Sequence, residues 1–356
     1  MVKKTQPKKS SSQLAPSTNE GQSQAKEQPP SQDPKHQQRL LNIFSECFNS
    51  VLSSDELPTL LRDVKQALYD RNFSVAFGSE DHLEVYAARW SPTRALCYAS
   101  VLQDIVQQHA DDIVVGQNEE ETEQEGHDQE PHLRMISIGG CAAEHVAFAS
   151  MLHSTSLVGQ LTLIDSGPWS KIANMLQTAL TTPPPLSKYA SAAAKASNTA
   201  LVQPHQLSLS FQQLDILEQA EDGSQLAKLV APEQQPVLVT LFFTLNELYT
   251  SGGIGKTTKF LSSLERLLPR RSLLLVVDSP GSYSEAAVGK EKKRYPMHWL
   301  LDHTLRDPKE EESSWERLES QDSIWFRLPK DLSYPMQLED MRYQLHLYRL
   351  RENDQE

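Results

Sequence analysis

Short apolar runs alternate with amphipathic segments from residue 133 onward. The apolar runs have the length and composition of buried strands and lie at Leu133–Ile138, Gln160–Ile164, Leu207–Gln213, Val237–Phe243 and Ser272–Val277. Helical spacing of apolar positions predicts helices at Glu144–Leu152, Trp169–Leu180, Thr257–Leu268 and Met297–Thr304. Two more strands are predicted at Trp325–Leu328 and Met341–Leu350, the second with the alternation of an antiparallel strand. The pattern predicts an α/β fold with a doubly wound parallel sheet and an antiparallel C-terminal strand.

Residues 39–112 have a different pattern, in which apolar side chains recur every three or four positions. We therefore expect an N-terminal helical cap ahead of the sheet. Within it, Ser91 is predicted as an N-cap residue with Pro92 at the first helical position. Arg94 would then face a ligand, while packing on the core is the more ordinary role for Trp90.

Three segments differ in composition from the remainder. Residues 1–38 carry six lysines against three acids and almost no large apolar groups, which predicts a disordered basic tail. Residues 113–132 are expected to form an acidic loop, since 117–130 contains seven acids and no base. Residues 133–356 form the predicted main domain, with a Pro/Ala-rich insertion at 181–205.

The formal net charge of −13 argues against broad electrostatic attraction to nucleic acid. Any RNA contact must then come from local basic patches such as residues 290–294. No apolar run is long enough for a membrane span, and the three scattered cysteines suit neither a zinc site nor a disulfide scaffold. Neither a membrane nor a metal is expected, and the oligomeric state is left open.

The residues that follow the predicted strands carry the candidate chemistry, because ligands of doubly wound sheets bind beyond the carboxyl ends of the strands. A small-residue turn follows the first strand and acids follow the second and third. This order matches the cofactor plan of class I S-adenosylmethionine (SAM)-dependent methyltransferases, where the turn meets the methionine and ribose, the first acid the ribose hydroxyls, and the second the adenine. A tight strand-to-helix joint is the alternative for the turn. The expected cofactor-binding residues are Gly139, Gly140, Cys141, Asp165, Asp215 and Thr244.

A competing motif lies at residues 251–258, which imitate a phosphate-binding loop with Lys256 as its lysine. Seven residues separate it from Phe243 at the end of the fourth predicted strand, however, and Thr250 stands where the general pattern has glycine. A P-loop-type ATPase remains an alternative, as does a non-catalytic ribosome-assembly factor.

Six blocks, in order, resemble the fungal 25S rRNA uridine-N3 methyltransferase family. They lie at 89–96, 137–140, 243–248, 276–283, 295–302 and 341–344, within a likeness that runs from about 39 to 351. The resemblance implies a Rossmann-like methyltransferase sheet, SAM as cofactor, and N3 of a uridine in large-subunit rRNA as the methyl acceptor. It further implies rRNA or a pre-ribosomal particle as partner and a nuclear or nucleolar location, with the cytoplasm as a second compartment.

Methylation at N3 requires that the proton on this nitrogen leave, which calls for a base. We expect Glu247 or Asp278 in this role, with Asn246 orienting the uracil edge. Each acid has a structural alternative, Glu247 at a helix start and Asp278 at the Pro280-Gly281 turn. N3 lies on the pairing edge, so the base must be unpaired or flipped out. The expected substrate-binding residues are Arg94, Tyr283 and Trp299, with Trp169 as a further stacking candidate, although aromatic residues are more often part of a core.

Overall fold

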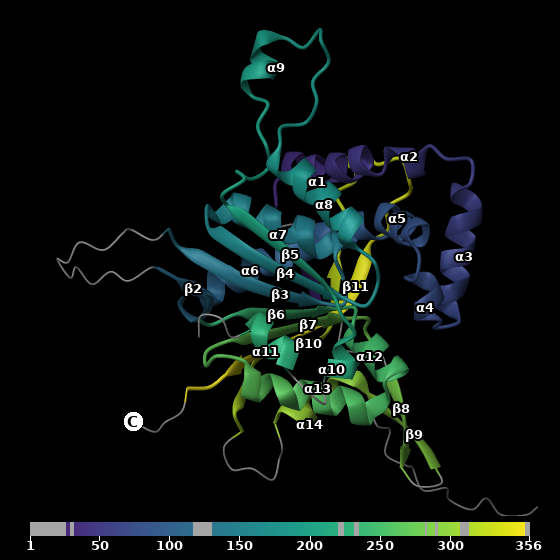
Figure 1. Cartoon of the computed structure of the whole chain (residues 1–356), viewed down its shortest axis with the longest axis vertical. Coiled ribbons are helices and arrows are strands. Elements are labelled where there is room, and N and C mark those ends of the chain that lie inside the picture. The colour runs from purple at the N-terminus through teal and green to yellow at the C-terminus, as the bar shows by residue number, and fades with distance from the viewer. Residues whose placement is uncertain are drawn as a thin grey trace, which may run out of the picture.

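The computed structural model describes residues 26–28, 32–116, 130–219, 224–230, 235–281, 283–288, 291–306 and 313–352. Within these ranges a nine-stranded sheet has the order β1-β10-β11-β7-β6-β3-β4-β5, with β2 paired to β3 at one end. Strands β3 to β7 of this sheet are parallel, and β11 is antiparallel to β7. The predicted doubly wound sheet with an antiparallel C-terminal strand is therefore confirmed (Figure 1). The strands are β1 (Lys26–Gln28), β2 (Val114–Val115), β3 (His132–Ile138), β4 (Val158–Asp165), β5 (Leu207–Gln213), β6 (Leu238–Phe242), β7 (Leu273–Asp278), β10 (Trp315–Phe326) and β11 (Met341–Leu350).

Helices cover both faces of the sheet, and the side chains of successive strand residues point alternately into two hydrophobic cores. Met135 and Leu163 point into the core under α1, α6, α7 and α8, whereas Ile136 and Ile164 point into the core under α12, α13 and α14. Figure 1 shows α1 and α8 on one side and α13 and α14 on the other. The helices are α1 (Pro34–Cys47), α2 (Asn49–Leu52), α3 (Leu57–Tyr69), α4 (Phe73–Ala76), α5 (Glu80–Arg89), α6 (Ser91–Ile113), α7 (Ala142–Thr155), α8 (Ser170–Thr181), α9 (Ala192–Ala196), α10 (Ile216–Gln219), α11 (Ser224–Val230), α12 (Leu245–Ser251), α13 (Gly253–Leu267) and α14 (Met297–Leu305).

The N-terminal region differs from its prediction in three ways. Helix α1 begins at Pro34, and β1 pairs with β10, so order extends into the predicted tail; residues 1–25 and 29–31 lie outside the described ranges. Helix α6 lies on the sheet itself, where the ring centroid of Tyr98 is 4.4 Å from that of Phe242, so the predicted cap shares its core with the main domain. Ser91 does not cap α6 but is its first residue, because Trp90 before it has αR geometry (φ −107°, ψ −31°) rather than the extended backbone of a side-chain cap.

The polar segments also differ from expectation. Strand β10 begins at Trp315, ten residues before the predicted strand. The first part of this strand was not predicted because few of its side chains are buried, so the apolar pattern of a core strand is missing. A hairpin of β8 (Tyr283–Val288) and β9 (Glu291–Pro296) was not predicted. Strand β2 lies within the predicted acidic loop, of which 117–129 is outside the described ranges. The insertion at 181–205 contains α9 and projects from the body of the molecule (Figure 1).

The segment that imitates a phosphate loop is helical, so the P-loop alternative is not supported. Helix α12 ends at Ser251 and α13 begins at Gly253. The Thr257 hydroxyl donates to the Gly253 carbonyl at 3.0 Å rather than facing a ligand. A phosphate loop presents free backbone amides directly after a strand, and helix α12 stands in that place here.

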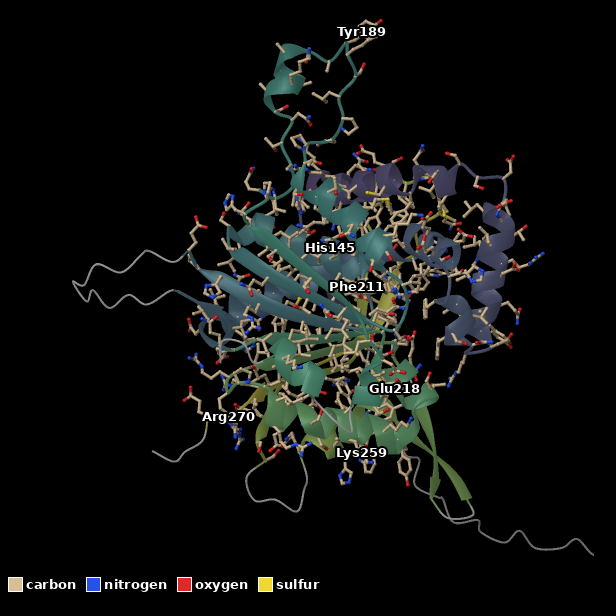
Figure 2. All side chains as sticks on the ribbon, viewed as in Figure 1. His145, Tyr189, Phe211, Glu218, Lys259 and Arg270 are labelled. Carbon is tan, nitrogen blue, oxygen red and sulfur yellow. The ribbon has the colours of Figure 1, made fainter. Side chains whose placement is uncertain are left out.

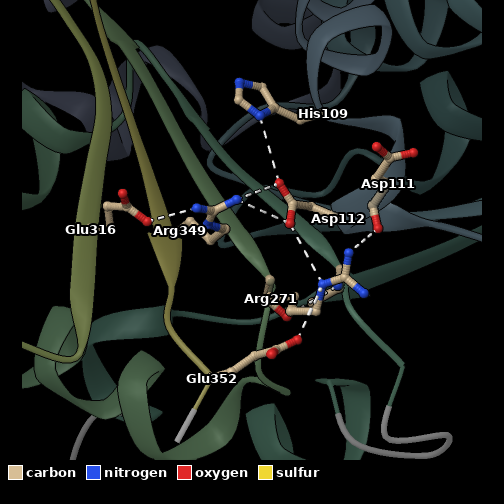
Figure 3. Close-up of polar contacts among 9 residues, drawn as sticks. His109, Asp111, Asp112, Arg271, Glu316, Arg349 and Glu352 are labelled. Atoms are coloured by element: carbon tan, nitrogen blue, oxygen red, sulfur yellow. Dashed lines mark hydrogen bonds and ion pairs between the residues drawn. The ribbon is translucent and has the colours of Figure 1, made fainter. Parts of the chain in front are cut away.

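An ion-pair network holds the edge of the sheet opposite the carboxyl ends of the parallel strands (Figure 3). Asp112, in the last turn of α6, accepts from Arg349 of β11 at 3.0 Å and lies 3.6 Å from Arg271, which precedes β7. His109 lies 3.6 Å from the same carboxylate, and Arg349 also donates to Glu316 of β10 at 2.7 Å. The end of α6 is thus fixed to three strands.

In the described part of the chain, none of the helices is both long and apolar enough for a bilayer. The same residues contain no group of three or more histidine, cysteine or acidic side chains that could hold a metal ion.

Candidate active site

A cavity of about 540 Å³ opens at the carboxyl ends of the parallel strands. Strand β3 is flanked by β4 on one side and β6 on the other, so the loops that follow these strands diverge and leave a crevice. Gly139, Asp165 and Asp215, from the ends of β3, β4 and β5, all line this one cavity. Its opposite wall comes from Phe77 and other residues between α4 and α6. The loops named from sequence therefore converge.

The turn after β3 is packed against β6 by a close contact. Gly139 has a φ of +81°, and a Cβ atom there would lie 2.1 Å from Cγ2 of Thr244. The Thr244 hydroxyl lies 2.8 Å from the Gly139 carbonyl oxygen and 3.0 Å from that of Ile138, to which it donates. Thr244 borders the cavity, as expected of a cofactor-binding residue, and its hydroxyl donates to the backbone of the turn. A Cβ at Gly140 would meet Oε1 of Glu144 at 2.6 Å, but that atom ends a flexible side chain, so Gly139 is the position of the turn where glycine is required.

The two acids after β4 and β5 are oriented by their own turns. Asp165 Oδ1 accepts from the Gly167 amide at 2.7 Å, and Asp215 Oδ1 accepts from the Leu217 amide at 2.9 Å. Burial raises the pKa of Asp165 to about 6. Cys141 is 1% exposed, and burial likewise raises the pKa of its thiol. A cavity with two fixed carboxylates and a small-residue turn suits a nucleoside with hydroxyl and amino donors.

Arg94 brings a positive charge to the cavity from the first turn of α6. Its Nη1 donates to the Tyr86 hydroxyl, and its Cζ lies 4.6 Å from the ring centroid of Phe243. Two carboxyls, Glu144 of α7 and Glu247 of α12, interact electrostatically with this guanidinium and line the same cavity. Burial raises the pKa of Glu144 to about 7 and that of Glu247 to about 8, against the opposing effect of Arg94.

Glu144 was assigned no role from sequence, although it stands in the first turn of the helix that follows the glycines. An acid at that position is ordinarily explained by the helix dipole. Glu144 becomes part of the site because Arg94, on α6, lies at the same cavity and interacts with its carboxyl. Trp169 also lines the cavity, with its ring 6.2 Å from that of Tyr86 in an edge-on arrangement.

Other predicted residues lie elsewhere among those described. Asp278 is 1% exposed, and its carboxylate accepts from the amides of Asn246 at 3.0 Å and Ser279 at 2.7 Å. Burial raises its pKa to about 6, but it does not border the cavity, and Asn246 contributes its backbone amide to this contact. Trp299 is 47% exposed on α14, away from the cavity. The side chain of Tyr283 is outside the described part of the structure.

The role of Asp278 as a base stays a prediction, and the contacts that the structure gives it are structural. Both of its oxygens are held by backbone amides, so it fixes the start of α12 and with it the position of Glu247. The stacking of Trp299 on the reacting base likewise stays a prediction, and its exposed ring stands on α14, outside the lining of the cavity.

The cavity also fits SAM by its size and donor set. Its volume falls within the range of about 300–1,000 Å³ that is typical of small-molecule sites. Gly139 and Gly140 leave the turn without side chains, Asp165 and Asp215 supply acceptors, and the side chains of Ile164 and Leu217 supply apolar wall.

Comparison with known proteins shows the family of this chain. A family model described as "Putative SAM-dependent methyltransferase" matches residues 44–349. The 25S rRNA (uridine(2843)-N(3))-methyltransferase of Saccharomyces cerevisiae is 28% identical, over 87% of this chain and 85% of the relative.

Solved structures of methyltransferases are also similar to this chain. The N-methyltransferase NodS from Bradyrhizobium japonicum, in complex with S-adenosylhomocysteine, is 12% identical, with a TM-score of 0.35 over 84% of this chain and 100% of that one. An O-methyltransferase family protein from Burkholderia thailandensis is 14% identical, with a TM-score of 0.36 over 84% of this chain and 71% of that one. Because the family model spans nearly all of the chain beyond its N-terminal tail, the protein belongs to this family of SAM-dependent methyltransferases.

Proposed function

We propose that this protein transfers a methyl group from SAM to N3 of a uridine in 25S, large-subunit rRNA. The observation that carries the proposal is the shared cavity in which the Gly139 turn and Asp165 meet Arg94 and Glu247. The name of the yeast relative supports uridine N3 as the acceptor. The P-loop ATPase alternative has no phosphate loop among the described residues, and a non-catalytic assembly factor would have no use for these buried ionisable groups.

The cofactor-binding half of the cavity is formed by the loops after β3, β4 and β5. We assign the turn Gly139-Gly140-Cys141 to the methionine and ribose part, Asp165 to the ribose hydroxyls and Asp215 to the adenine side. When bound, SAM supplies an electrophilic methyl group on a positively charged sulfur. The protein's contribution is to hold donor and acceptor in line, which is where most of the barrier reduction arises.

Glu247 is the group we assign as the base. It lines the cavity near Arg94, and its helix is fixed by the contact between Asp278 and the Asn246 amide. A carboxyl with a pKa near 8 is well matched to an imide proton, because a base works best when its pKa lies near the operating pH. Burial favours the neutral acid that forms when Glu247 takes the N3 proton.

Arg94 is assigned to the charge that develops on the uracil when N3 loses its proton. Its guanidinium is always protonated and carries several donors, of which one is given to Tyr86. A cation fixed beside the reacting base stabilises the developing anion without having to reorganise. Glu144, which interacts electrostatically with the same guanidinium, is assigned to holding Arg94 at the cavity.

The test is single-turnover methyl transfer to large-subunit rRNA, with N3-methyluridine detected by mass spectrometry of nucleosides. Glu247→Gln should slow transfer by a factor of about 10²–10⁴, the usual loss when a general base is removed, while SAM affinity is kept. Wild-type transfer by Glu247→Gln would contradict the assigned base. Asp165→Ala, measured by calorimetry, should weaken SAM binding; unchanged affinity would contradict the assigned pocket.

We further propose that the acceptor is presented in a pre-ribosomal particle within the nucleus or nucleolus. The chain's net charge of −13 supports specific docking over general attraction to rRNA. Purified particles should therefore be methylated faster than the same rRNA freed of protein. Equal rates on both would contradict this part of the proposal.

A further inference from the structure

Three aromatic rings form a column on the outer face of α14. Tyr295 and Trp299 stack with centroids 5.2 Å apart, and Trp299 and His303 stack at 5.1 Å, with planes 16° apart in both pairs. The inward side chains of this helix, including Leu300 and Leu301, are buried in the core. We call Tyr295, Trp299 and His303 the α14 aromatic column.

Trp299 is the exposed tryptophan of this chain. It is 47% exposed, whereas the other four tryptophans are buried or half-buried. A tryptophan stabilises a fold mainly when its large ring is buried, so packing does not explain this position. His303, one helical turn further along, is exposed too, so the end of the column faces solvent.

The sequence around the α14 aromatic column is basic although the chain as a whole is acidic. Residues 253–306 carry ten lysine and arginine residues against five acids, while the full chain has a net charge of −13. Lys256 and Lys259 are exposed on α13, which packs against α14, and Figure 2 shows Lys259 at the outer side of that helix. Lys292, Lys293 and Arg294 precede Tyr295 directly on β9.

The hairpin connects this surface with the cavity. Strand β8 begins soon after the end of β7 at the carboxyl edge of the sheet, and it packs against α12, which carries Glu247. Strand β9 then leads into α14. The polypeptide backbone thus leads from the end of the sheet at the cavity to the start of the α14 aromatic column.

We propose that the α14 aromatic column, together with the exposed lysines of α13, binds an unpaired stretch of the RNA substrate outside the catalytic cavity. The inference rests on the proposed function. Bases extend the column by stacking at its solvent-facing end, and Lys256 and Lys259 contact the phosphates. Stacked aromatic rings beside a basic strip are the elements by which proteins hold single-stranded RNA without reading its sequence.

The experiment measures binding of a fluorescein-labelled 20-nucleotide oligouridine to the full chain by fluorescence anisotropy. Trp299→Ala should weaken binding about five-fold or more, since stacking on one aromatic ring contributes about 1–3 kcal/mol per base. Trp299→Phe should restore most of the affinity. Tyr189→Ala is the matched control, because Tyr189 is 83% exposed on the distant 181–205 insertion and should leave binding unchanged (Figure 2).

A second variant tests the phosphate contacts separately. Replacing Lys256 and Lys259 together by alanine should reduce the slope of log affinity against log salt by up to about 1.4, at about 0.7 for each phosphate of a single strand that is no longer neutralised. An unchanged slope would contradict the proposed phosphate contacts. SAM affinity, measured by calorimetry on every variant, shows that the fold is intact.

The proposal is overturned if Trp299→Ala binds oligouridine as the wild type does, or if Tyr189→Ala loses as much affinity. Absence of RNA binding by the wild type would also overturn it and would leave a protein partner as the occupant of this face. A different outcome separates the two proposals. If Trp299→Ala loses RNA binding but the wild type makes no N3-methyluridine, only the proposed function is refuted.

Discussion

Gly139→Ala is the substitution whose effect the structure defines most closely. The new Cβ would lie 2.1 Å from Cγ2 and 2.4 Å from Oγ1 of Thr244, and the backbone would remain at a φ of +81°. The left-handed conformation costs an ordinary residue about 1–2 kcal/mol. Displacing Thr244 breaks its hydroxyl contacts with the Gly139 and Ile138 carbonyls, at about 1 kcal/mol more. We expect the free energy of unfolding to fall by about 2–3 kcal/mol and SAM affinity to fall with it.

Urea unfolding followed by circular dichroism, with SAM calorimetry beside it, measures both quantities. Gly281→Ala is the control, because Gly281 has a φ of +73° but a Cβ added there would meet nothing within 4 Å. It should show only the backbone cost. Thr244→Ala removes the two atoms nearest to the new Cβ. The Gly139→Ala/Thr244→Ala double variant should therefore lose about 1 kcal/mol less of the free energy of unfolding than the sum of the losses of the two single variants. The reasoning is refuted if Gly139→Ala costs no more than Gly281→Ala, or if the Gly139 and Thr244 losses simply add.

Three further predictions concern the carboxyls, the ion network and the discarded motif. The folded-state pKa of Glu247 is raised from 4.5 to about 8, so the unfolded chain ionises first and this group destabilises the ligand-free protein as pH rises through that window. Glu247→Gln should therefore gain stability over wild type at pH 8 but not at pH 4.5, by urea midpoint, and an equal difference at both pH values would contradict this. Asp112→Asn should cost about 1.5–3 kcal/mol in thermal unfolding, since charged hydrogen bonds to Arg349 are lost, whereas Asp63→Asn at the exposed Arg62 pair should cost under about 1 kcal/mol; equal losses would argue against the network. Lys256→Ala should change stability by less than about 0.5 kcal/mol, and ATP should not shift the melting temperature of the wild type; an ATP shift lost in the variant would revive the P-loop alternative.

The central strands that hold the cavity could be predicted because they are buried on both faces. Each of β3, β6 and β7 is a short, nearly continuous apolar run, whereas β4 and β5 show alternating apolar positions. The residues at the ends of these strands, such as Gly139 and Asp165, could therefore be placed at one edge of the sheet. The first ten residues of strand β10 were not predicted, because their burial is intermittent and many of them are polar. The β8–β9 hairpin is a basic segment without that apolar signal.

The polar half of the site was harder to predict than the fold. Distances along the chain do not reveal that Arg94 and Glu144, fifty residues apart, reach the same cavity. The direction of a side chain could not be predicted from the sequence either. Asp278 ends a strand as Asp165 does, but its carboxylate points at backbone amides. Ser91 was misjudged because capping depends on the φ and ψ angles of its neighbour, which the sequence Trp-Ser-Pro does not determine.

Helix α6 carries a ligand-facing residue near one end and an ion-paired residue near the other, but it is not straight. Arg94 stands in its first turn and Asp112 in its last, and between them His109 departs from helical geometry (φ −130°, ψ 27°), so the regular helix that holds Arg94 rises only about 22 Å before the kink. The ion pairs of Asp112 with Arg349 and Arg271 hold the segment beyond the kink, whereas the buried residues of α6 ahead of the kink pack in the core. A substitution at Asp112 should therefore loosen the last turn of α6 and reach Arg94 only through the core contacts that lie between them.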